Sequence, residues 1–412
     1  MKLSIIVCAY NTPKELLRAS FESIKSSTIS KYDGEYEICL VDDGSELDYS
    51  DLISEYNVKA IKTENRGIFS ARMTGIEMAE GDYIAFCDSD DTVSSNYYLP
   101  MLELAMKEDI DIVINDWAYH VGSLKYYCKN DITIKKEISL RNEEIIPAFL
   151  AQRGRYHSFF VLWNKIYKSK AIKTAISKIV EIAYPEKSSY GEDALMNFFT
   201  WQEAKSVKNI HSGYYFYRIH QNQTVNVESE EKLKSQIYYM SKTLEAIEKS
   251  LRNHIHAEKL LEHVDEWRML SARFLYEKIR SGGYLELCDY LREQYGILKL
   301  EKPKRIDGCA YLTKKLLGDN FDEVDSIIRS LYSNDEVKAV KCSSDKYTQK
   351  CLNCLAENGK ITLSKKKAFD IAIPKLKSSL KHKIIFDPII YRLSLVLLGK
   401  NSRFRRILKK HI

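Results

Sequence analysis

The chain has 412 residues, of which 45% are hydrophobic, 29% charged and 11% aromatic. This length and composition exclude a disordered protein and predict a folded chain with more than one domain. The net charge is only +6, yet residues 375–412 contain 11 Lys or Arg and a single acidic residue. Such a basic end on a near-neutral chain favours an anionic surface as partner, and no nucleic acid partner is expected.

Short apolar strands alternate with helical patterns over residues 1–115. Strands are predicted at 3–8, 36–41, 58–63, 83–87 and 110–114, and helices at 13–26, from about 68, and at 96–107. Thr12 is expected to cap the first helix, with Pro13 at its first position and Glu15 completing a capping box. The alternation predicts an α/β fold with a mostly parallel sheet, which binds ligands at the carboxyl ends of its strands.

The pattern changes twice in the rest of the chain. Residues 226–371 are mainly helical by periodicity, and the basic residues that follow alternate with Ile, Leu and Phe. We therefore predict a ligand-binding domain over 1–225, a helical accessory domain over 226–371 and a basic amphipathic tail over 372–412. The tail is typical of a segment that lies on an anionic membrane surface. A terminal helix packed on the helical domain is the alternative.

The location of the protein follows from its apolar runs and its cysteines. No uninterrupted apolar run reaches the roughly 18 residues that a membrane helix needs, so no span is predicted. Nine cysteines are scattered along the chain, several of them within predicted strands, as expected in a reducing compartment. We expect a cytoplasmic protein that is peripheral on the inner face of the cell membrane.

A cluster of carboxylates, Asp88-Ser89-Asp90-Asp91, follows the predicted strand 83–87. Crowded carboxylates repel one another, and burial adds a desolvation penalty to their charged forms. A hard divalent cation such as Mg²⁺ or Mn²⁺ offsets both effects, because it prefers oxygen ligands. The alternative is a surface turn, since Asp and Ser are common turn residues.

A second acidic pair, Asp42-Asp43, also follows a predicted strand. Asp43 is a candidate acceptor for the N–H of a uracil ring, with Ala9 and Tyr10 of the neighbouring strand flanking the base. The alternative is again a turn with a helix cap. Polar clusters at three successive strand ends of one sheet are a stronger signal than any one of them.

In order and spacing, these motifs resemble family 2 glycosyltransferases with a GT-A fold, of the bacterial cell-surface polysaccharide type. The matching stretches are Ser4 to Asn11, Val41 to Ser45, Asn65-Arg66-Gly67 through Ala71-Arg72 to Gly75, and Gly81 to Asp91. The resemblance covers about residues 1–225 and implies a GT-A (Rossmann-like) fold for that domain, which the mainly helical part follows. It implies an inverting, metal-dependent transfer from a nucleotide-diphospho-sugar, expected to be UDP-linked, to a hydroxyl of a glycan or lipid-linked glycan.

The resemblance also assigns roles to single residues at the predicted sheet edge. The expected donor-binding residues there are Ala9, Tyr10, Asn11, Asp43, Arg72, Asp88 and Ser89. Among them, Asp88 is expected to contact the ribose or the metal. Asp90 is expected to coordinate Mn²⁺ or Mg²⁺.

Another acidic pair, Glu192-Asp193, follows Gly191 and precedes an apolar helical run. An acidic pair at a helix start ordinarily caps the helix and complements its dipole. The resemblance implies a different role, because the family carries a Glu-Asp pair at this place in the chain. Asp193 is then the general base that takes the proton of the acceptor hydroxyl. Its partner Glu192 is expected to orient the acceptor.

Two motifs of aromatic and basic residues each allow more than one interpretation. Arg218 and His220 follow an aromatic strand-like run, where a cation would stabilise the charge that develops on the diphosphate. His220 is also a candidate third metal ligand, and the alternative for both is an ordinary edge-strand position. In Trp163-Asn164-Lys165, the Trp163 ring could stack on a sugar, but its apolar surroundings predict a core residue.

Two other functions fit parts of the pattern. A sugar nucleotidyltransferase shares the architecture and the metal but needs a Gly-rich phosphate loop near the first strand. Residues 7–12 contain no Gly, which argues against that class. A non-catalytic glycan-assembly scaffold that retains the fold would be expected to lose the metal or base carboxylates, and both are present.

Overall fold

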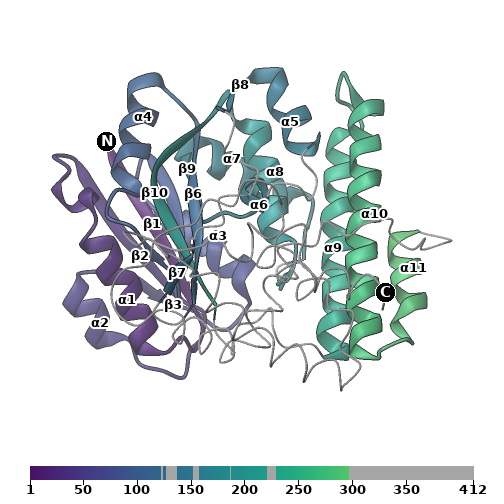
Figure 1. Cartoon of the computed structure of the whole chain (residues 1–412), viewed down its shortest axis with the longest axis horizontal. Coiled ribbons are helices and arrows are strands. Elements are labelled where there is room, and N and C mark those ends of the chain that lie inside the picture. The colour runs from purple at the N-terminus through teal and green to yellow at the C-terminus, as the bar shows by residue number, and fades with distance from the viewer. Residues whose placement is uncertain (122–123, 127–136, 152–156, 186, 220–228, 297–412) are drawn as a thin grey trace, which may run out of the picture. The chain divides into compact units, whose positions relative to one another are not determined.

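The computed structural model describes residues 1–121, 124–126, 137–151, 157–185, 187–219 and 229–296 (Figure 1). The described residues within Met1–Trp117, Asp131–Arg218 and Val227–Asp307 form one compact unit. His220 and the predicted tail at 372–412 lie outside the described residues. Among the helices that the structure describes, none has both the length and the apolar character that a membrane span requires.

A ten-stranded mixed sheet forms the centre of the described chain. Eight strands follow the order β3-β2-β1-β4-β9-β6-β10-β5, while β7 pairs with β6 and β8 pairs with β10. The strands are β1 (Lys2–Ala9), β2 (Glu35–Asp42), β3 (Lys59–Lys62), β4 (Tyr83–Asp88), β5 (Thr92–Val93), β6 (Ile112–Val121), β7 (Leu124–Tyr126), β8 (Ser139–Arg141), β9 (Lys165–Lys168) and β10 (Ser206–Ile219). Strands β1 to β4 pair in parallel, as predicted. The later strand β9 runs antiparallel to both β4 and β6, so the sheet as a whole is mixed.

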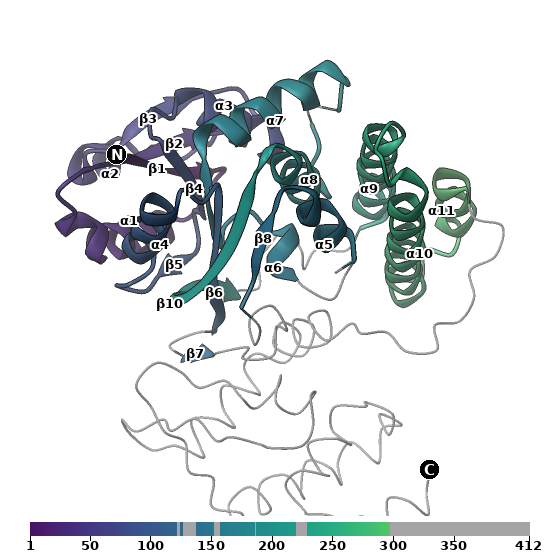
Figure 2. The ribbon, with the colours of Figure 1, turned by 90° about the horizontal axis from the view of Figure 1, so that it is seen from above.

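Helices cover both faces of this sheet (Figure 2). They are α1 (Lys14–Lys25), α2 (Ser50–Tyr56), α3 (Ile68–Met78), α4 (Tyr98–Glu108), α5 (Ile145–Ala151), α6 (His157–Phe160), α7 (Ser169–Glu181), α8 (Glu192–Glu203), α9 (Glu230–Leu251), α10 (Ala257–Gly282) and α11 (Leu287–Tyr295). Figure 2 shows α3 and α7 over one face and α1 and α4 over the other. Strand β1 can be apolar along most of its length because both of its faces are buried.

The apolar core continues from the sheet into the helices that follow it. One cluster of buried residues includes Ile6 of β1, Trp201 of α8, Leu244 of α9 and Trp267 of α10. Gly191, just before α8, has a φ of 86°, a conformation that favours glycine. A Cβ atom added at Gly191 would lie 2.9 Å from Oγ1 of Thr243, so the start of α8 packs closely on α9. The predicted domain boundary at 225/226 stays a prediction.

The predicted cap of the first helix is wrong. Pro13, rather than Thr12, occupies the N-cap position of α1, and no side chain caps the helix. The hydroxyl of Thr12 instead shares a hydrogen bond of 2.7 Å with the hydroxyl of Ser89, and both residues are buried. The Thr12 hydroxyl is therefore not available to cap α1, because it bonds to Ser89 in the turn that follows β4.

Gly75 of α3 makes a close contact with β1. A Cβ atom added at Gly75 would lie 2.4 Å from Cγ2 of Ile6. Within a helix, Ala is normally more favourable than Gly by about 0.5–1 kcal/mol. The contact with Ile6 should reverse that preference.

We expect Gly75→Ala to lower the free energy of unfolding by about 1–3 kcal/mol, the usual cost of over-packing a core. Urea denaturation would measure the difference. Glu77→Ala, on the exposed side of the same helix, is the control and should change stability by less than about 0.5 kcal/mol. A Gly75→Ala variant as stable as the wild type would contradict the close packing of α3 on β1.

Candidate active site

The carboxyl ends of β1, β2 and β4 meet at one edge of the sheet, because the three strands are parallel. In the register of the strands, Ala9 lies opposite Asp42, and Cys8 lies opposite Asp88. Ala9 is buried, whereas Tyr10 is 54% exposed and free to flank a ligand. The structure thus brings together the polar clusters that were predicted at these strand ends.

Local hydrogen bonds hold the loops behind this edge. Asn11 has a positive φ of 49°, and its N–H donates to Oγ of Ser45 at 2.8 Å. The Asp43 carboxylate accepts the backbone N–H groups of Arg66 and Gly67 at 2.9 and 2.8 Å. Asp43 therefore anchors the turn before α3. Each of its oxygens has a second lone pair, so it retains the capacity to accept from a base.

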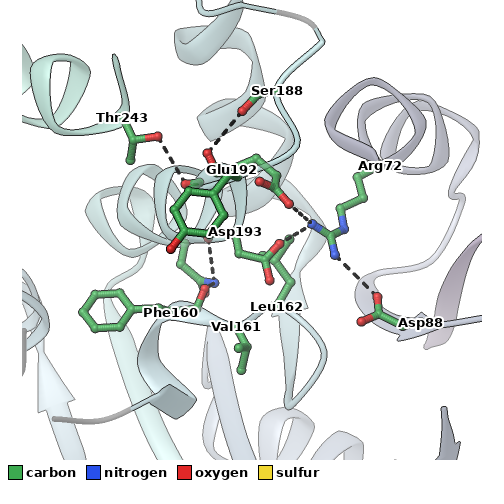
Figure 3. Close-up of polar contacts among 12 residues, drawn as sticks. Arg72, Asp88, Phe160, Val161, Leu162, Ser188, Glu192, Asp193 and Thr243 are labelled. Atoms are coloured by element: carbon green, nitrogen blue, oxygen red, sulfur yellow. Dashed lines mark hydrogen bonds and ion pairs between the residues drawn. The ribbon is translucent and has the colours of Figure 1, made fainter. Parts of the chain in front are cut away.

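Arg72 of α3 is buried and lies among three carboxylates (Figure 3). Its Nη2 lies 3.4 Å from Oδ1 of Asp88, at the end of β4. Its Nη1 lies 3.2 Å from Oε1 of Glu192 and also pairs with Asp193, both in the first turn of α8. A single guanidinium, which stays charged in proteins, therefore joins the predicted metal carboxylate to the predicted base.

Burial and repulsion perturb the carboxyl groups around Arg72. The pKa of Glu192 is raised to about 7 by burial and then by Asp193, against the lowering effect of Arg72. The pKa of Asp88 is raised to about 6 by burial, while Arg72 lowers it and Asp90 raises it. Oε2 of Glu192 is buried and has no hydrogen-bond partner among the described residues. The Asp193 side chain is 26% exposed, against 10% for Glu192, so Asp193 is the more accessible of the pair.

The last residue of the carboxylate cluster, Asp91, has a different environment from Asp88 and Asp90. Asp91 is fully buried and accepts the hydroxyl of Tyr215 at 2.8 Å and the N–H of Arg218 at 2.6 Å. The Tyr215 hydroxyl in turn accepts the N–H of Asp88 at 2.9 Å. Nε of Arg218 donates to the carbonyl oxygen of Asp90 at 2.7 Å. Asp91 thus ties the turn to β10 and is occupied by protein donors.

Asp88 and Asp90 fit a divalent cation. Burial and the charge of Asp90 raise the pKa of Asp88, and a bound cation would relieve that repulsion. Mg²⁺ commonly takes one or two carboxylates and completes its shell with water and phosphate oxygens. The described part of the chain holds no group of three or more His, Cys, Asp or Glu arranged as metal ligands. Phosphate and water oxygens would therefore have to complete the shell, and His220 lies outside the described residues.

Several buried side chains support the site without having been predicted as site residues. Tyr215 orients the carboxylate turn, and Asn197 donates from Nδ2 to the carbonyl oxygen of Asp193 at 3.0 Å. An amide one turn after an acidic pair, inside an apolar helix, was the available signal for Asn197. The prediction that Trp163 is a core residue is confirmed, since it is 3% exposed and stacks on Tyr215 at 4.4 Å between ring centroids.

Known proteins share this sequence pattern and this fold. Residues 4–174 match the family described as Glycosyl transferase family 2. EpsH of Bacillus subtilis, itself assigned as a glycosyltransferase, is 27% identical over 299 residues, which cover 69% of this chain and 82% of EpsH. The poly(ribitol-phosphate) beta-glucosyltransferase of Bacillus spizizenii is 35% identical over 121 residues, which cover 29% of this chain and 19% of that protein.

A solved structure supports the same fold. S. aureus TarS 1–349, crystallised in complex with UDP-GlcNAc, matches this chain with a TM-score of 0.53 and 16% sequence identity. The match covers 82% of this chain and 95% of the TarS chain. The sheet and the helices around it thus form a GT-A domain, which a helical part follows.

The raised pKa of Glu192 leads to a prediction about stability. An acid with a higher pKa in the folded state holds its proton more tightly when folded. Its contribution to stability therefore falls as the pH rises from the unfolded value near 4.5 to the folded value of about 7. Glu192→Gln is neutral at every pH. We expect it to exceed the wild type in free energy of unfolding by about 1–3 kcal/mol near pH 8 and to match it near pH 4.5.

Urea denaturation at both pH values would measure this effect. Glu181→Gln, at the exposed end of α7, is the matched control and should not change the pH dependence of stability. A difference between Glu192→Gln and the wild type that is the same at both pH values would contradict the raised pKa.

Proposed function

Because the chain belongs to glycosyl transferase family 2, we propose that it is an inverting enzyme that transfers a sugar from a UDP-linked donor. The acceptor in this proposal is a hydroxyl of a glycan or lipid-linked glycan. The reaction is a single displacement, in which the acceptor oxygen attacks the anomeric carbon while the donor diphosphate leaves. The setting is the synthesis of a capsule, cell wall or other surface polysaccharide, and the similarity to a poly(ribitol-phosphate) glucosyltransferase supports it.

The observation that carries the proposal is the shared contact of Arg72 with Asp88 and Asp193. An inverting transfer needs the leaving diphosphate and the attacking hydroxyl on opposite sides of one sugar carbon. The carboxylate for the metal and the carboxylate for the base must therefore lie at one site but on two sides of it. The Arg72 guanidinium contacts both carboxylates and so meets this requirement, because it holds Asp88 and Asp193 at one site without letting them touch.

Asp193 is the general base in this proposal. It lies in the first turn of α8, and its side chain is the more accessible of the acidic pair. Asp193 pairs with the Arg72 guanidinium, and its carboxylate is a group that can accept a proton. Glu192 contacts Arg72 through one oxygen and has the other buried, which supports a role in holding Arg72 rather than in contacting the acceptor.

Asp88 and Asp90 would hold Mn²⁺ or Mg²⁺ in this proposal. The bound ion would neutralise the charge that develops on the leaving diphosphate. Arg218 supports the same turn, because it donates to the carbonyl oxygen of Asp90 and to Asp91. Ser89, buried against Thr12, keeps the turn close to the end of β1.

The nucleotide would bind at the ends of β1 and β2. Asp43 has acceptor capacity for a uracil N–H, and the exposed Tyr10 ring can cover the base beside Ala9 and Asn11. The complex of the structurally similar TarS with UDP-GlcNAc supports a UDP-linked donor. Binding of the basic residues 372–412 to an anionic membrane would bring the enzyme to a lipid-linked acceptor on the cytoplasmic face.

The sharpest test of the base is Asp193→Asn. This change keeps the volume and the helix start but removes the proton acceptor, and general-base catalysis contributes about 10²–10⁴ in rate. We expect turnover, measured as UDP released from UDP-sugars in the presence of Mn²⁺, to fall in that range. The affinity for UDP should stay nearly unchanged, and Glu192→Gln should lower turnover less. Near-normal turnover, or a loss of UDP affinity instead, would contradict the assignment.

Metal dependence gives a second test. EDTA should abolish UDP release, and added Mn²⁺ or Mg²⁺ should restore it. Asp90→Ala should lose most activity and bind UDP with Mn²⁺ more weakly in calorimetry, with no loss of fold. Asp51→Ala removes an exposed carboxylate that pairs with Lys14 and serves as the control. Full activity in EDTA would exclude the metal from the mechanism.

A further inference from the structure

Lys165, the first residue of β9, is fully buried, and its ammonium group lies among neutral oxygen atoms. Nζ donates to the carbonyl oxygens of Ser158 and Val161, the latter at 2.5 Å, and to Oδ1 of Asn164 at 2.7 Å. Three acceptors match the three N–H groups of an ammonium ion. Lysine is rarely buried, because each donor must then be satisfied. Core packing alone does not explain why a lysine is buried at position 165.

Two of these three acceptors are carbonyl groups of the segment 158–162, which contains the end of α6 and leads to β9. Other carbonyl groups of the segment also face side-chain donors. Nδ2 of Asn197 donates to the carbonyl oxygen of Phe160 at 2.9 Å. The hydroxyl of Tyr167 lies 3.2 Å from the carbonyl oxygen of Leu162. The segment is therefore held by β9 on one side and by α8 on the other.

The α8 donor also connects this segment to Asp193. Asn197 lies one turn after Asp193, and its Nδ2 donates to the Asp193 carbonyl oxygen at 3.0 Å as well. The Tyr167 hydroxyl donates to Oδ1 of Asn197 at 2.9 Å, which fixes the orientation of the amide. Figure 3 shows residues 160–162 beside the first turn of α8, next to Asp193. Burial lowers the pKa of Lys165 well below its ordinary value, and the nearby charge of Asp193 raises it in part.

The residues just before Lys165 connect the same region to the carboxylate turn. The Trp163 ring stacks on Tyr215, and the Tyr215 hydroxyl accepts the N–H of Asp88. The backbone carbonyl of Trp163 accepts the hydroxyl of Tyr97 at 3.1 Å. Trp163-Asn164-Lys165 thus runs from the turn of Asp88 to the segment that contacts the base helix.

We propose that Lys165 is a positioning residue for the base. By holding residues 158–162 against α8, it fixes the direction of the Asp193 carboxylate and forms the wall of the site on the acceptor side. This inference rests on the function proposed above, in which Asp193 is the base. Lys165 acts through Asp193 and does not touch the substrate, so its loss should affect turnover far more than donor binding.

Lys165→Met tests the proposal, because Met keeps most of the volume and removes the three donors. The matched control is Lys278→Met. Lys278 of α10 is also buried, at 3% exposure, and donates to Oε1 of Gln236 at 3.3 Å within the helical part. Asn164→Ala removes a single acceptor of Lys165 and is the alternative test if Lys165→Met does not fold. Turnover is measured as UDP released from UDP-GlcNAc and UDP-glucose with Mn²⁺, and donor affinity as the Kd for UDP with Mn²⁺.

We expect Lys165→Met to lower turnover about tenfold to hundredfold, the usual effect of misplacing a reacting group by about 1 Å. The Kd for UDP should change by less than about twofold. Asn164→Ala should also lower turnover without changing this Kd, but by a smaller factor. Backbone amides of 158–162 and of the first turn of α8 should exchange hydrogen faster. Lys278→Met should lower the Tm but leave turnover, Kd and the exchange at 158–162 unchanged.

Unchanged turnover in a folded Lys165→Met variant overturns the proposal, as do equal losses of turnover and UDP affinity. A wild-type protein that binds UDP but releases none from any UDP-sugar refutes the proposed function instead. In that case hydrogen exchange still tests whether Lys165 holds residues 158–162 against α8. Faster exchange at 158–162 and at the start of α8 supports it, and unchanged exchange overturns it.

Discussion

The ion cluster around Arg72 is the constraint on which the rest of the site depends. A guanidinium taken out of water needs carboxylates close by, and here they come from β4 and from the start of α8. Three acidic groups face one cation, so the balance of charge is negative. This surplus, together with burial, raises the pKa values of Asp88 and Glu192. A cluster of this kind favours an added cation, which is what a diphosphate-binding site also requires.

Local patterns predicted much of the fold. Apolar runs at 3–8 and 83–87 are strands in the structure, because short β-branched segments with polar ends suit a sheet covered on both faces. The pairing of Arg72 with Asp193 was not predicted, since 121 positions separate them and periodicity does not show which partner meets a given face of α3. The expected cap by Thr12 failed for the same reason, because Ser89, 77 positions away, takes its hydroxyl.

The structure also distinguishes carboxylates whose roles cannot be told apart from the sequence. Asp88, Asp90 and Asp91 stand in one short turn, and any two could hold a cation. Only the fold shows that Asp91 is used by Tyr215 and the backbone of Arg218. Likewise, Lys165 looks like a surface residue in the sequence, and its burial follows from the antiparallel insertion of β9 between β4 and β6. Such residues support a site without carrying a motif of their own.

The contact at Gly191 has a consequence for protein engineering. A Cβ at this position would lie 2.9 Å from Oγ1 of Thr243 and 3.1 Å from Sδ of Met240, both on α9. The starting point of α8, and with it the position of the proposed base Asp193, is therefore set partly by a helix outside the sheet. Grafting the helices of a relative onto this sheet would change the surface of α9 and the place where α8 begins at the same time. A functional chimera therefore needs a start of α8 and a surface of α9 that come from the same protein.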